Sequence, residues 1–337
     1  CLLVAGGAYG QSNRQLQPIP SSPKEDLTAI EQLFAPPPVE KPNTMFPELR
    51  ERWKDTPAFL RDSKIDFNLR SYYRDNVTSS PNSSAVQEAW ASGGWVTAET
   101  GKLFDLVSLG ATLYTSFPIY APSGYGNTLM LLPNQQGYAV FGELYGQAHL
   151  FEDTHKITVG RKRYNTPFIG PHDNRMTPNT FSGYSLIGTL GDEKGDGLSL
   201  RYGGGYIDAM KQRDAITFQS MASAAGVPTS NAGVGVVGGL LKWGPASLGA
   251  MNYYGQDLLN IFYVEGRYGV EFGNGMSAVA AAQFAAQNST GQALMNGGTP
   301  FATNEVGAKV QLGWDEFILT LGYTAVNPGF ALQIGRA

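Results

Sequence analysis

Arginine and lysine side chains recur along this chain in patterns that could bind anions. A guanidinium group presents a planar fork of donors that matches the two oxygens of a carboxylate, so a row of such groups would attract carboxylates. The candidate basic row consists of Arg70, Arg74, Arg161, Arg163, Arg175, Arg201, Arg267 and Lys309. Glu143 and Asp173 could line a facing acidic pocket, which would favour solutes that also carry a basic group.

The histidines and glycines of the chain indicate neither an enzyme nor a metal or cofactor site. His172 and Asp173 are adjacent in "PHDN", which is not the i, i+4 spacing of two metal ligands on a helix. No G-x-S-x-G motif marks a nucleophilic serine. The glycines at 203–205 precede no Lys-Ser or Lys-Thr pair, so they do not form a phosphate-binding loop.

The segment "LRDSKIDFNLRSYYRDN", residues 60–76, alternates apolar and polar side chains. Phe67, Leu69, Ser71 and Tyr73 share one face, and Asp66, Asn68, Arg70, Tyr72 and Arg74 share the other. A period of two predicts a β-strand with one apolar and one charged side. Such a strand covers a core in a soluble protein, or separates lipid from an aqueous lumen in a membrane barrel.

Similar segments follow one another to the end of the chain, with lengths typical of strands that cross a bilayer at a tilt. The 13 predicted strands are 65–75, 86–99, 103–115, 137–150, 155–162, 180–190, 197–207, 232–243, 246–256, 259–272, 276–287, 303–314 and 317–326. The sequence therefore predicts an all-β protein.

The connections between these strands alternate in length. The long ones are 76–85, 116–136, 163–179, 208–231 and 288–302, and the others have two to six residues. Only 257–258 is short where a long connection is due. This alternation is typical of outer-membrane barrels, whose extracellular loops are long and periplasmic turns short. It predicts a transmembrane antiparallel β-barrel.

The faces of the predicted strands agree with a barrel. A charge at mid-strand on the lipid face would cost roughly 2–4 kcal/mol, so the arginines and lysines are expected to point inward. There they could guide solutes, or simply pair with acids such as Glu265, Glu271 and Glu305. Aromatic residues near strand ends fit interfacial girdles: Trp90, Tyr114, Trp243, Tyr254, Trp314 and Tyr323.

Composition narrows the class of protein further. Only 15% of residues are charged and the formal net charge is -4, so no basic field indicates a nucleic-acid partner. No run of 18 apolar residues predicts a membrane-spanning helix. With a single cysteine, Cys1, the chain has neither a disulfide framework nor a thiolate metal site.

The N-terminal part divides into two predicted segments before the barrel at 63–337. Residues 1–10, within "CLLVAGGAYGQ", are interpreted as the remnant of a secretory signal peptide; a lipoprotein beginning at Cys1 is the alternative. Residues 11–62 are rich in Pro and charge and predict a flexible periplasmic arm, with one short helix in "DLTAIEQLF".

Three ordered segments carry a family resemblance: "FLRDSKIDFNLRSYYRDN", "QEAWASGGWVTAETG" and "KITVGRKRYNTPFIGPHDNRMTPNTFSGYSL". Together they closely resemble landmarks of the OprD-type outer-membrane porin family, and the resemblance extends from Phe59 to the C-terminus. It implies a barrel of about 18 antiparallel strands in the bacterial outer membrane, often in loose trimers and in contact with lipid and lipopolysaccharide.

The same resemblance implies a pathway. In such porins the third extracellular loop folds into the lumen and forms a constriction opposite a ladder of Arg and Lys; here that loop is 163–179. We expect passive diffusion of small carboxylates such as amino acids and aromatic or other organic acids. A general diffusion porin and a structural or adhesive barrel are the alternatives. Because 13 strands would leave an open sheet edge, we also expect a fragment that lacks its last four or five strands.

Overall fold

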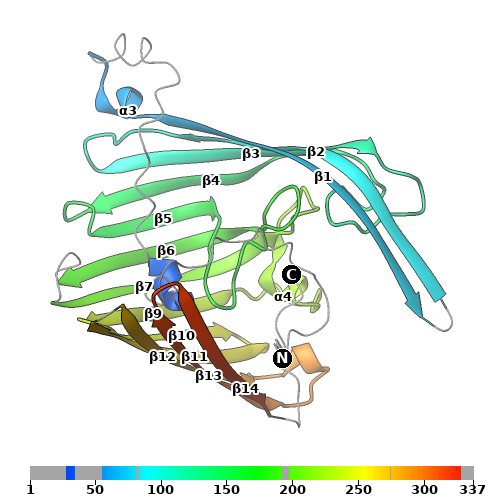
Figure 1. Cartoon of the computed structure of the whole chain (residues 1–337). Coiled ribbons are helices and arrows are strands. Elements are labelled where there is room, and N and C mark those ends of the chain that lie inside the picture. Colours follow the sequence, from blue (N-terminus) through cyan, green and yellow to red (C-terminus); the bar gives the residue numbers. More distant parts are fainter. Residues whose placement is uncertain (1–27, 35–54, 81–82, 192–196, 274, 328–337) are drawn as a thin grey trace.

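The computed structural model describes residues 28–34, 55–80, 83–191, 197–273 and 275–327. The predicted signal-peptide remnant, the nature of Cys1, most of the predicted arm and the last ten residues lie outside this part of the chain. The described residues form one strongly curved antiparallel sheet, in which each long strand pairs with the next one along the chain (Figure 1).

The sheet has 14 strands, of which the two-residue β8 lies beside β7 and off the main path. The strands are β1 (Lys64–Ser80), β2 (Ser83–Glu99), β3 (Val107–Tyr120), β4 (Tyr138–Leu150), β5 (His155–Lys162), β6 (Thr180–Gly191), β7 (Leu198–Lys211), β8 (Gln219–Ser220), β9 (Val234–Trp243), β10 (Ala246–Gly255), β11 (Leu259–Gly273), β12 (Met276–Ser289), β13 (Ala302–Trp314) and β14 (Phe317–Val326). All 13 predicted strands are confirmed.

The first predicted loop, at 76–85, is wrong. β1 and β2 instead continue their pairing through this region until Ser80 lies opposite Ser83. Val77 faces Val86 there, and β-branched residues favour extended strands even where the flanking residues are polar. The two strands consequently project beyond the rest of the sheet (Figure 1).

Helical structure is sparse in the described part of the chain. It consists of α1 (Ala29–Phe34), α3 (Ala58–Arg61), α4 (Met221–Ala224) and the 3-10 turn η2 (Leu294–Asn296). α1 lies inside the predicted "DLTAIEQLF" segment, so that helix is confirmed. None of the described helices has the length and apolarity needed to cross a membrane.

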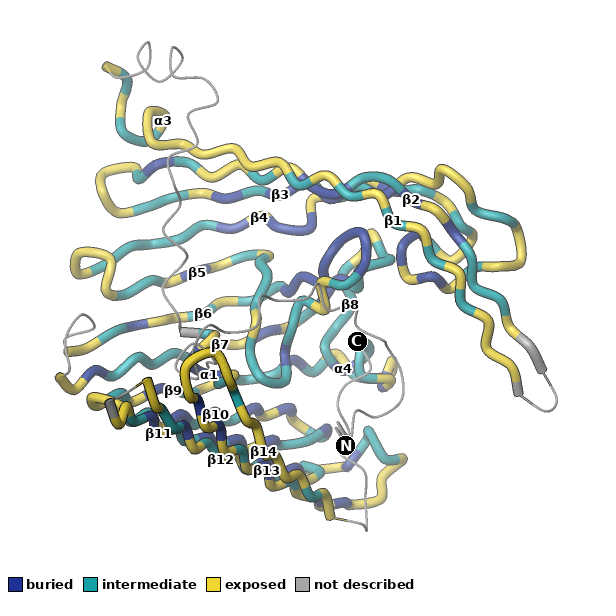
Figure 2. The backbone as a smooth tube through the Cα atoms, in the orientation of Figure 1, coloured by how far each residue is buried: buried dark blue, intermediate teal, exposed yellow. Residues whose placement is uncertain are grey.

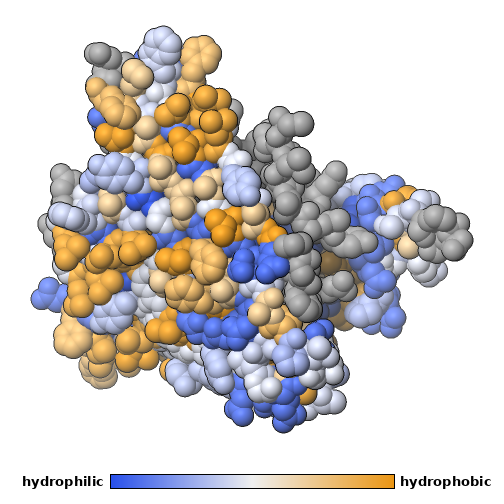
Figure 3. Space-filling model, turned by 90° about the horizontal axis from the view of Figure 1, so that it is seen from below, coloured by the Kyte–Doolittle hydropathy of each residue, from blue (hydrophilic) through white to orange (hydrophobic). Residues whose placement is uncertain are grey.

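The outer face of the sheet exposes large apolar side chains on alternate residues of its strands. On β1, Phe67 is 69% exposed and Leu69 is 87% exposed, while Arg70 between the outward positions is half-buried. The apolar residues continue over other strands, and orange patches cover much of the view in Figure 3. This alternation is the expected pattern for a lipid-facing barrel wall.

One predicted girdle residue is wrong. Trp243 and Trp314 are exposed on the outer face, as an interfacial girdle requires, but Tyr114 is fully buried. Burial alternates along β3, and Tyr114 has the same parity as the buried Thr112 and Ser116, so its ring points to the concave side. A position near a strand end therefore does not show whether an aromatic side chain points to the outer or the concave face of the sheet.

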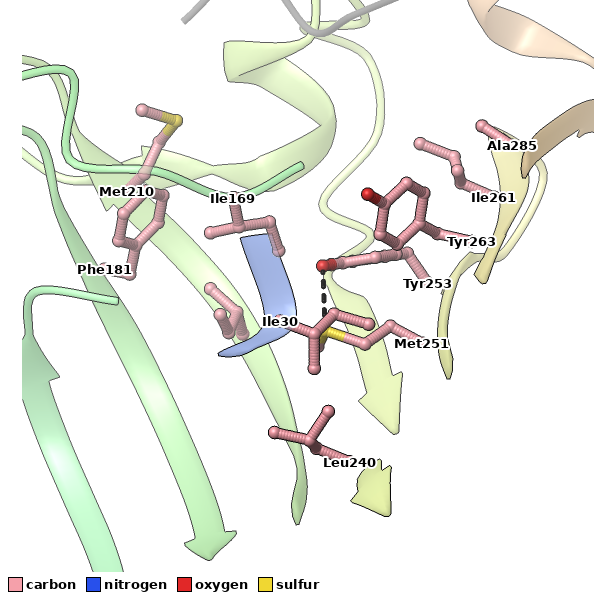
Figure 4. Close-up of a cluster of buried hydrophobic side chains, with 11 residues drawn as sticks. Ile30, Ile169, Phe181, Met210, Leu240, Met251, Tyr253, Ile261, Tyr263 and Ala285 are labelled. Atoms are coloured by element: carbon pink, nitrogen blue, oxygen red, sulfur yellow. Dashed lines mark hydrogen bonds between the residues drawn. The ribbon is translucent and has the colours of Figure 1, made fainter. Parts of the chain in front are cut away.

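The core lies on the concave side of the sheet (Figure 2). Its main cluster joins residues of β6, β7 and β9 to β12 with Ile30 of α1 and Ile169 of the 163–179 loop (Figure 4). A second cluster packs Met130, Leu131 and Met176 from two loops against Ala89 and Ala91 of β2. The interior is therefore partly filled by segments that return from the strand ends.

Candidate functional site

The loop between β5 and β6, residues 163–179, packs against the concave face of the sheet. Ile169 and Met176 enter the two core clusters, and Arg175 is 6% exposed. Hydrogen bonds within the loop fix its shape: the Asn179 amide donates to the Pro171 carbonyl at 2.7 Å. The charged side chains of this loop are thus held inside the curve of the sheet.

Arg70 of β1 holds one of the predicted acidic residues. Its guanidinium donates to both carboxylate oxygens of Asp173, at 2.6 and 3.0 Å, and to the backbone carbonyl of Arg175 at 2.7 Å. The same group lies 4.2 Å from the ring centre of Trp95, within the range of a cation–π contact. The first strand and the inward loop are therefore joined by a charged clamp.

Arg163, where the loop begins, holds the other acidic residue. Its Nε lies 2.8 Å from the Glu143 carboxylate, which also accepts the Tyr114 hydroxyl at 2.5 Å. Burial by itself would lower the pKa of Arg163, but the charge of Glu143, its hydrogen bond to Arg163 and the nearby Tyr114 and Asp173 together outweigh burial, and the pKa is raised. Arg163 also lies 5.5 Å from the ring centre of Trp95. We call Arg70 and Arg163 the paired arginines.

These pairs differ from the sequence-based expectation of a facing acidic pocket. Glu143 and Asp173 do lie on the concave side, but each carboxylate neutralises an arginine of the predicted row. The sequence could not show this because Arg70 and Asp173 are 103 positions apart.

A second group of arginines lacks such partners. Among the described residues, no salt bridge within 4.0 Å involves Arg74, Arg175 or Arg213. The Nε atoms of Arg74 and Arg175 are buried without a hydrogen-bond partner in that part of the chain. Burial lowers the pKa of Arg175, and the charges of Arg74 and Arg213 lower it further. We call these three residues the acid-free cluster, because among the described residues no carboxylate oxygen lies within 4.0 Å of their side-chain nitrogens.

Arg213 was missed by the sequence analysis. Its side chain donates to Asn174 Oδ1 and, at 3.4 Å, to the His172 carbonyl. Its backbone is fixed as well, since its amide donates to Asn179 Oδ1 at 2.8 Å and its carbonyl accepts the Tyr138 hydroxyl at 2.6 Å. Arg213 follows β7 in an irregular segment, so no strand period indicated its direction. The only signal was its place beside Lys211 in "KQRD".

The predicted residues of the later strands lie together on the concave wall. Strand register places Lys242, Ser247, Arg267, Ala281 and Lys309 in one row across β9 to β13. Arg201 is on the adjoining row, opposite Leu240. The structure thus adds Lys242 to the predicted Arg267 and Lys309, near the end of the sheet where the short turn at 244–245 lies.

The structure places Arg161 differently from the rest of the predicted row. It pairs with the exposed Leu144 and shares the parity of the exposed Val159, so it belongs to the outer face. Its guanidinium lies 4.4 Å from the ring centre of Phe218. The neighbouring Lys162 takes the inward position and lies 4.3 Å from the ring centre of Tyr145.

A cavity of about 430 Å³ opens beside the inward loop. Apolar side chains of the loop, the strands and α4 line it, including Phe168, Phe181, Met210 and Met221. Asn165, Thr166, His172 and Asp173 supply its polar part. Burial lowers the pKa of His172, and the nearby charge of Arg213 lowers it further. The neutral imidazole is therefore favoured.

A curved antiparallel sheet with an apolar outer face, charged inner wall and inward loop defines a transmembrane β-barrel channel of the porin type. The model of the family described as outer membrane porin, OprD family, matches residues 57–332. The chain therefore belongs to the OprD family, whose members are bacterial outer-membrane proteins. Family and fold are those of channels and not of enzymes.

Solved structures share this fold. OccK9 (OpdG) of Pseudomonas aeruginosa is 17% identical, with a TM-score of 0.64 over 80% of this chain and 69% of that one. OpdK of the same organism, solved with vanillate, is 19% identical, with a TM-score of 0.62 over 83% and 73% of the two chains. A BenF-like porin of Pseudomonas fluorescens Pf-5 is 18% identical, with a TM-score of 0.64 over 80% and 68%. No curated protein sequence matches the chain.

Proposed function

We propose that this porin preferentially conducts small solutes that combine a carboxylate with an apolar body, and that the acid-free cluster attracts the carboxylate. The observation that carries the proposal is Arg175, which is 6% exposed and whose Nε has no hydrogen-bond partner among the described residues. A buried donor of this kind is normally satisfied, and a carboxylate that enters among the three arginines would supply the missing acceptor.

The paired arginines make the acid-free cluster the preferred station for an anion. Asp173 and Glu143 already occupy the donor forks of Arg70 and Arg163, so their charges are largely cancelled. Arg74, Arg175 and Arg213 have no such carboxylate partner within 4.0 Å in the described part of the chain. Burial lowers the pKa of Arg213, the Asp214 carboxylate and more weakly Asp173 oppose this shift, and the charge of Arg74 adds to it. An anion among these groups would relieve their mutual repulsion.

The cavity beside the inward loop would accommodate the apolar body. His172 connects the two regions, because its carbonyl accepts Arg213 while the residue lines the cavity. OpdK, which has the same fold, was solved with vanillate, an aromatic carboxylate. That solute has the two parts that the cluster and the cavity would receive.

Lys242, Arg267 and Lys309 would form a second station nearer the short-turn end of the wall. Their row extends the positive potential along the lumen, so an anion that leaves the acid-free cluster does not meet a bare apolar wall. Several weak stations suit a channel, since conduction requires that a solute be able to leave each site.

The test is planar-bilayer conductance of the full-length protein with vanillate, and with vanillyl alcohol as the uncharged control. We expect vanillate alone to interrupt the ion current, and Arg175→Gln to weaken this block roughly ten-fold, as loss of a charge-assisted hydrogen bond would. Arg61→Gln, at an exposed arginine outside the sheet, should leave it unchanged. Equal block by both solutes, or none, would instead indicate a general diffusion porin.

A further inference from the structure

We infer that α1 is a second constriction element, fixed against the inner wall of the channel by Glu265 and Gly249, where it narrows the solute passage. The inference rests on the chain being a porin and not on its carboxylate preference. The family match begins at residue 57, so this helix belongs to a part of the chain that the family model does not cover.

The first contact is between the start of α1 and a wall carboxylate. The Ile30 amide donates to Glu265 Oε1 at 2.6 Å, and the Tyr263 hydroxyl donates to Glu265 Oε2 at 2.7 Å. Glu265 is 3% exposed, so its charge is satisfied by these donors and not by bulk water. A first-turn amide bound to a carboxylate also suits the positive end of a helix.

The second contact is between the Ile30 side chain and the backbone of Gly249. Ile30 is fully buried, and a Cβ atom added to Gly249 would lie 2.9–3.1 Å from three of its carbon atoms. Any larger residue at position 249 would therefore push Ile30 away from the wall. Figure 4 shows Ile30 beside Leu240 and Met251, which come from the neighbouring strands β9 and β10.

The helix also has local features that favour its formation at this place. The Thr28 amide donates to Glu31 Oε2 at 2.9 Å, and the Glu31 amide donates to Thr28 Oγ1 at 3.4 Å. This reciprocal capping box satisfies two amides that a short helix otherwise leaves open. Leu33 packs against the same core cluster as Ile30, so α1 has a defined apolar face.

The position of α1 along the passage follows from strand register. Gly249 lies in β10 only a few residues after the short turn at 244–245, whereas Ile169 of the inward loop belongs to the same cluster. α1 thus occupies the region between the inward loop and the short-turn end of the wall. A helix with its side chains is about 10 Å wide, so it removes a substantial share of the lumen.

Conductance of the full-length protein tests the proposal. Replacing residues 28–34 by a Gly/Ser segment of equal length should raise the single-channel conductance about two-fold, because a body of helical width leaves the passage. Gly249→Leu should raise it as well, by displacing Ile30. Gly307→Leu is the matched control: Gly307 lies in the same row of the wall, but the three atoms nearest to an added Cβ there belong to Gln283 and none of them to α1.

The two variants distinguish displacement from added bulk. If α1 narrows the passage, Gly249→Leu increases the current while Gly307→Leu decreases it slightly. Equal small decreases in both, together with unchanged conductance of the Gly/Ser variant, would overturn the proposal. Anion preference is read in the same recordings, so failure of the carboxylate proposal would be separately visible.

Cysteine protection tests docking without reference to conductance. In a Cys1→Ser background, which removes the one cysteine of this sequence, Ile30→Cys should resist a membrane-impermeant maleimide. Adding Glu265→Leu should release the helix and raise the labelling rate at least ten-fold, whereas Glu305→Leu, two strands away on the same wall, should not. Rapid labelling of the single Ile30→Cys variant would contradict the docked position.

Discussion

The paired arginines and the acid-free cluster use the same residue type around the same inward loop, yet they have different electrostatic roles. Arg70 and Arg163 each face a carboxylate and stand near one indole, so they tie the loop to the wall. Arg74, Arg175 and Arg213 form no salt bridge within the described residues, and the charges of Arg74 and Arg213 lower the pKa of Arg175. Burial alone therefore does not make an arginine available to a solute; the placement of nearby acids decides it.

Glu143→Gln should give the largest effect, on stability. Glu143 is 3% exposed and bonds both Arg163 and Tyr114, so its neutralisation leaves a partly buried cation without its counter-charge. We expect a loss of about 2 kcal/mol in the free energy of unfolding, measured by urea titration in vesicles. A loss similar to that of an exposed-site variant such as Asp62→Asn would show that the pair does not anchor the loop.

Arg175→Glu would turn the acid-free cluster into a paired one. The new carboxylate would lie near Arg74 and Arg213, so the site would lose its net attraction for anions. We expect the anion-to-cation permeability ratio to fall roughly ten-fold, as a charge reversal in a partly desolvated site predicts. Reversal potentials in a salt gradient measure the ratio. An unchanged ratio would place the selectivity of the channel elsewhere.

Asp173→Asn is the converse change, since it would release Arg70 from its partner. The anion-to-cation permeability ratio should rise about three-fold, less than the fall above because Arg70 keeps its contacts with Trp95 and the Arg175 carbonyl. A fall in the ratio would mean that the loop moves when the clamp opens.

The smallest effect concerns His172 and pH. Burial and Arg213 lower its pKa, so the folded protein favours the neutral ring and loses stability as protonation sets in on acidification. The added charge should raise the anion-to-cation permeability ratio about two-fold, only below the usual His range near 6.5. His172→Asn should abolish this rise in the permeability ratio, whereas any change in the ratio caused by protonation of carboxylates should remain. A rise centred above about pH 6.5 would contradict its assignment to His172.

Strand pattern predicted the sheet well because alternation is a local property of the chain. β5 and β14 have the predicted bounds, and most other strands differ by a few residues at their ends. The alternation of side chains along β5 would also have corrected the predicted inward direction of Arg161, because Ile157 and Val159 are on the same face and mark it as apolar. The pairing of the arginines could not be predicted, since it depends on residues brought together by the fold of the loop.

The same limit applies to α1. The helix itself was predictable from "DLTAIEQLF". Its docked position on the inner wall was not, because Ile30 and Glu265 are 235 positions apart in the sequence. Nothing local in either segment indicates the other. Gly249 gave no signal either, since a small residue in a strand has many explanations.

Trp95 gives this architecture an optical property. Its ring is 8% exposed and close to both paired arginines, whereas Trp90, Trp243 and Trp314 are exposed on the outer face. Brominated lipid should therefore quench the emission of the outer tryptophans and spare Trp95. In a Trp53→Phe background, which removes the fifth tryptophan of the sequence, the remaining emission would come from Trp95 and would report movement of the loop relative to the paired arginines.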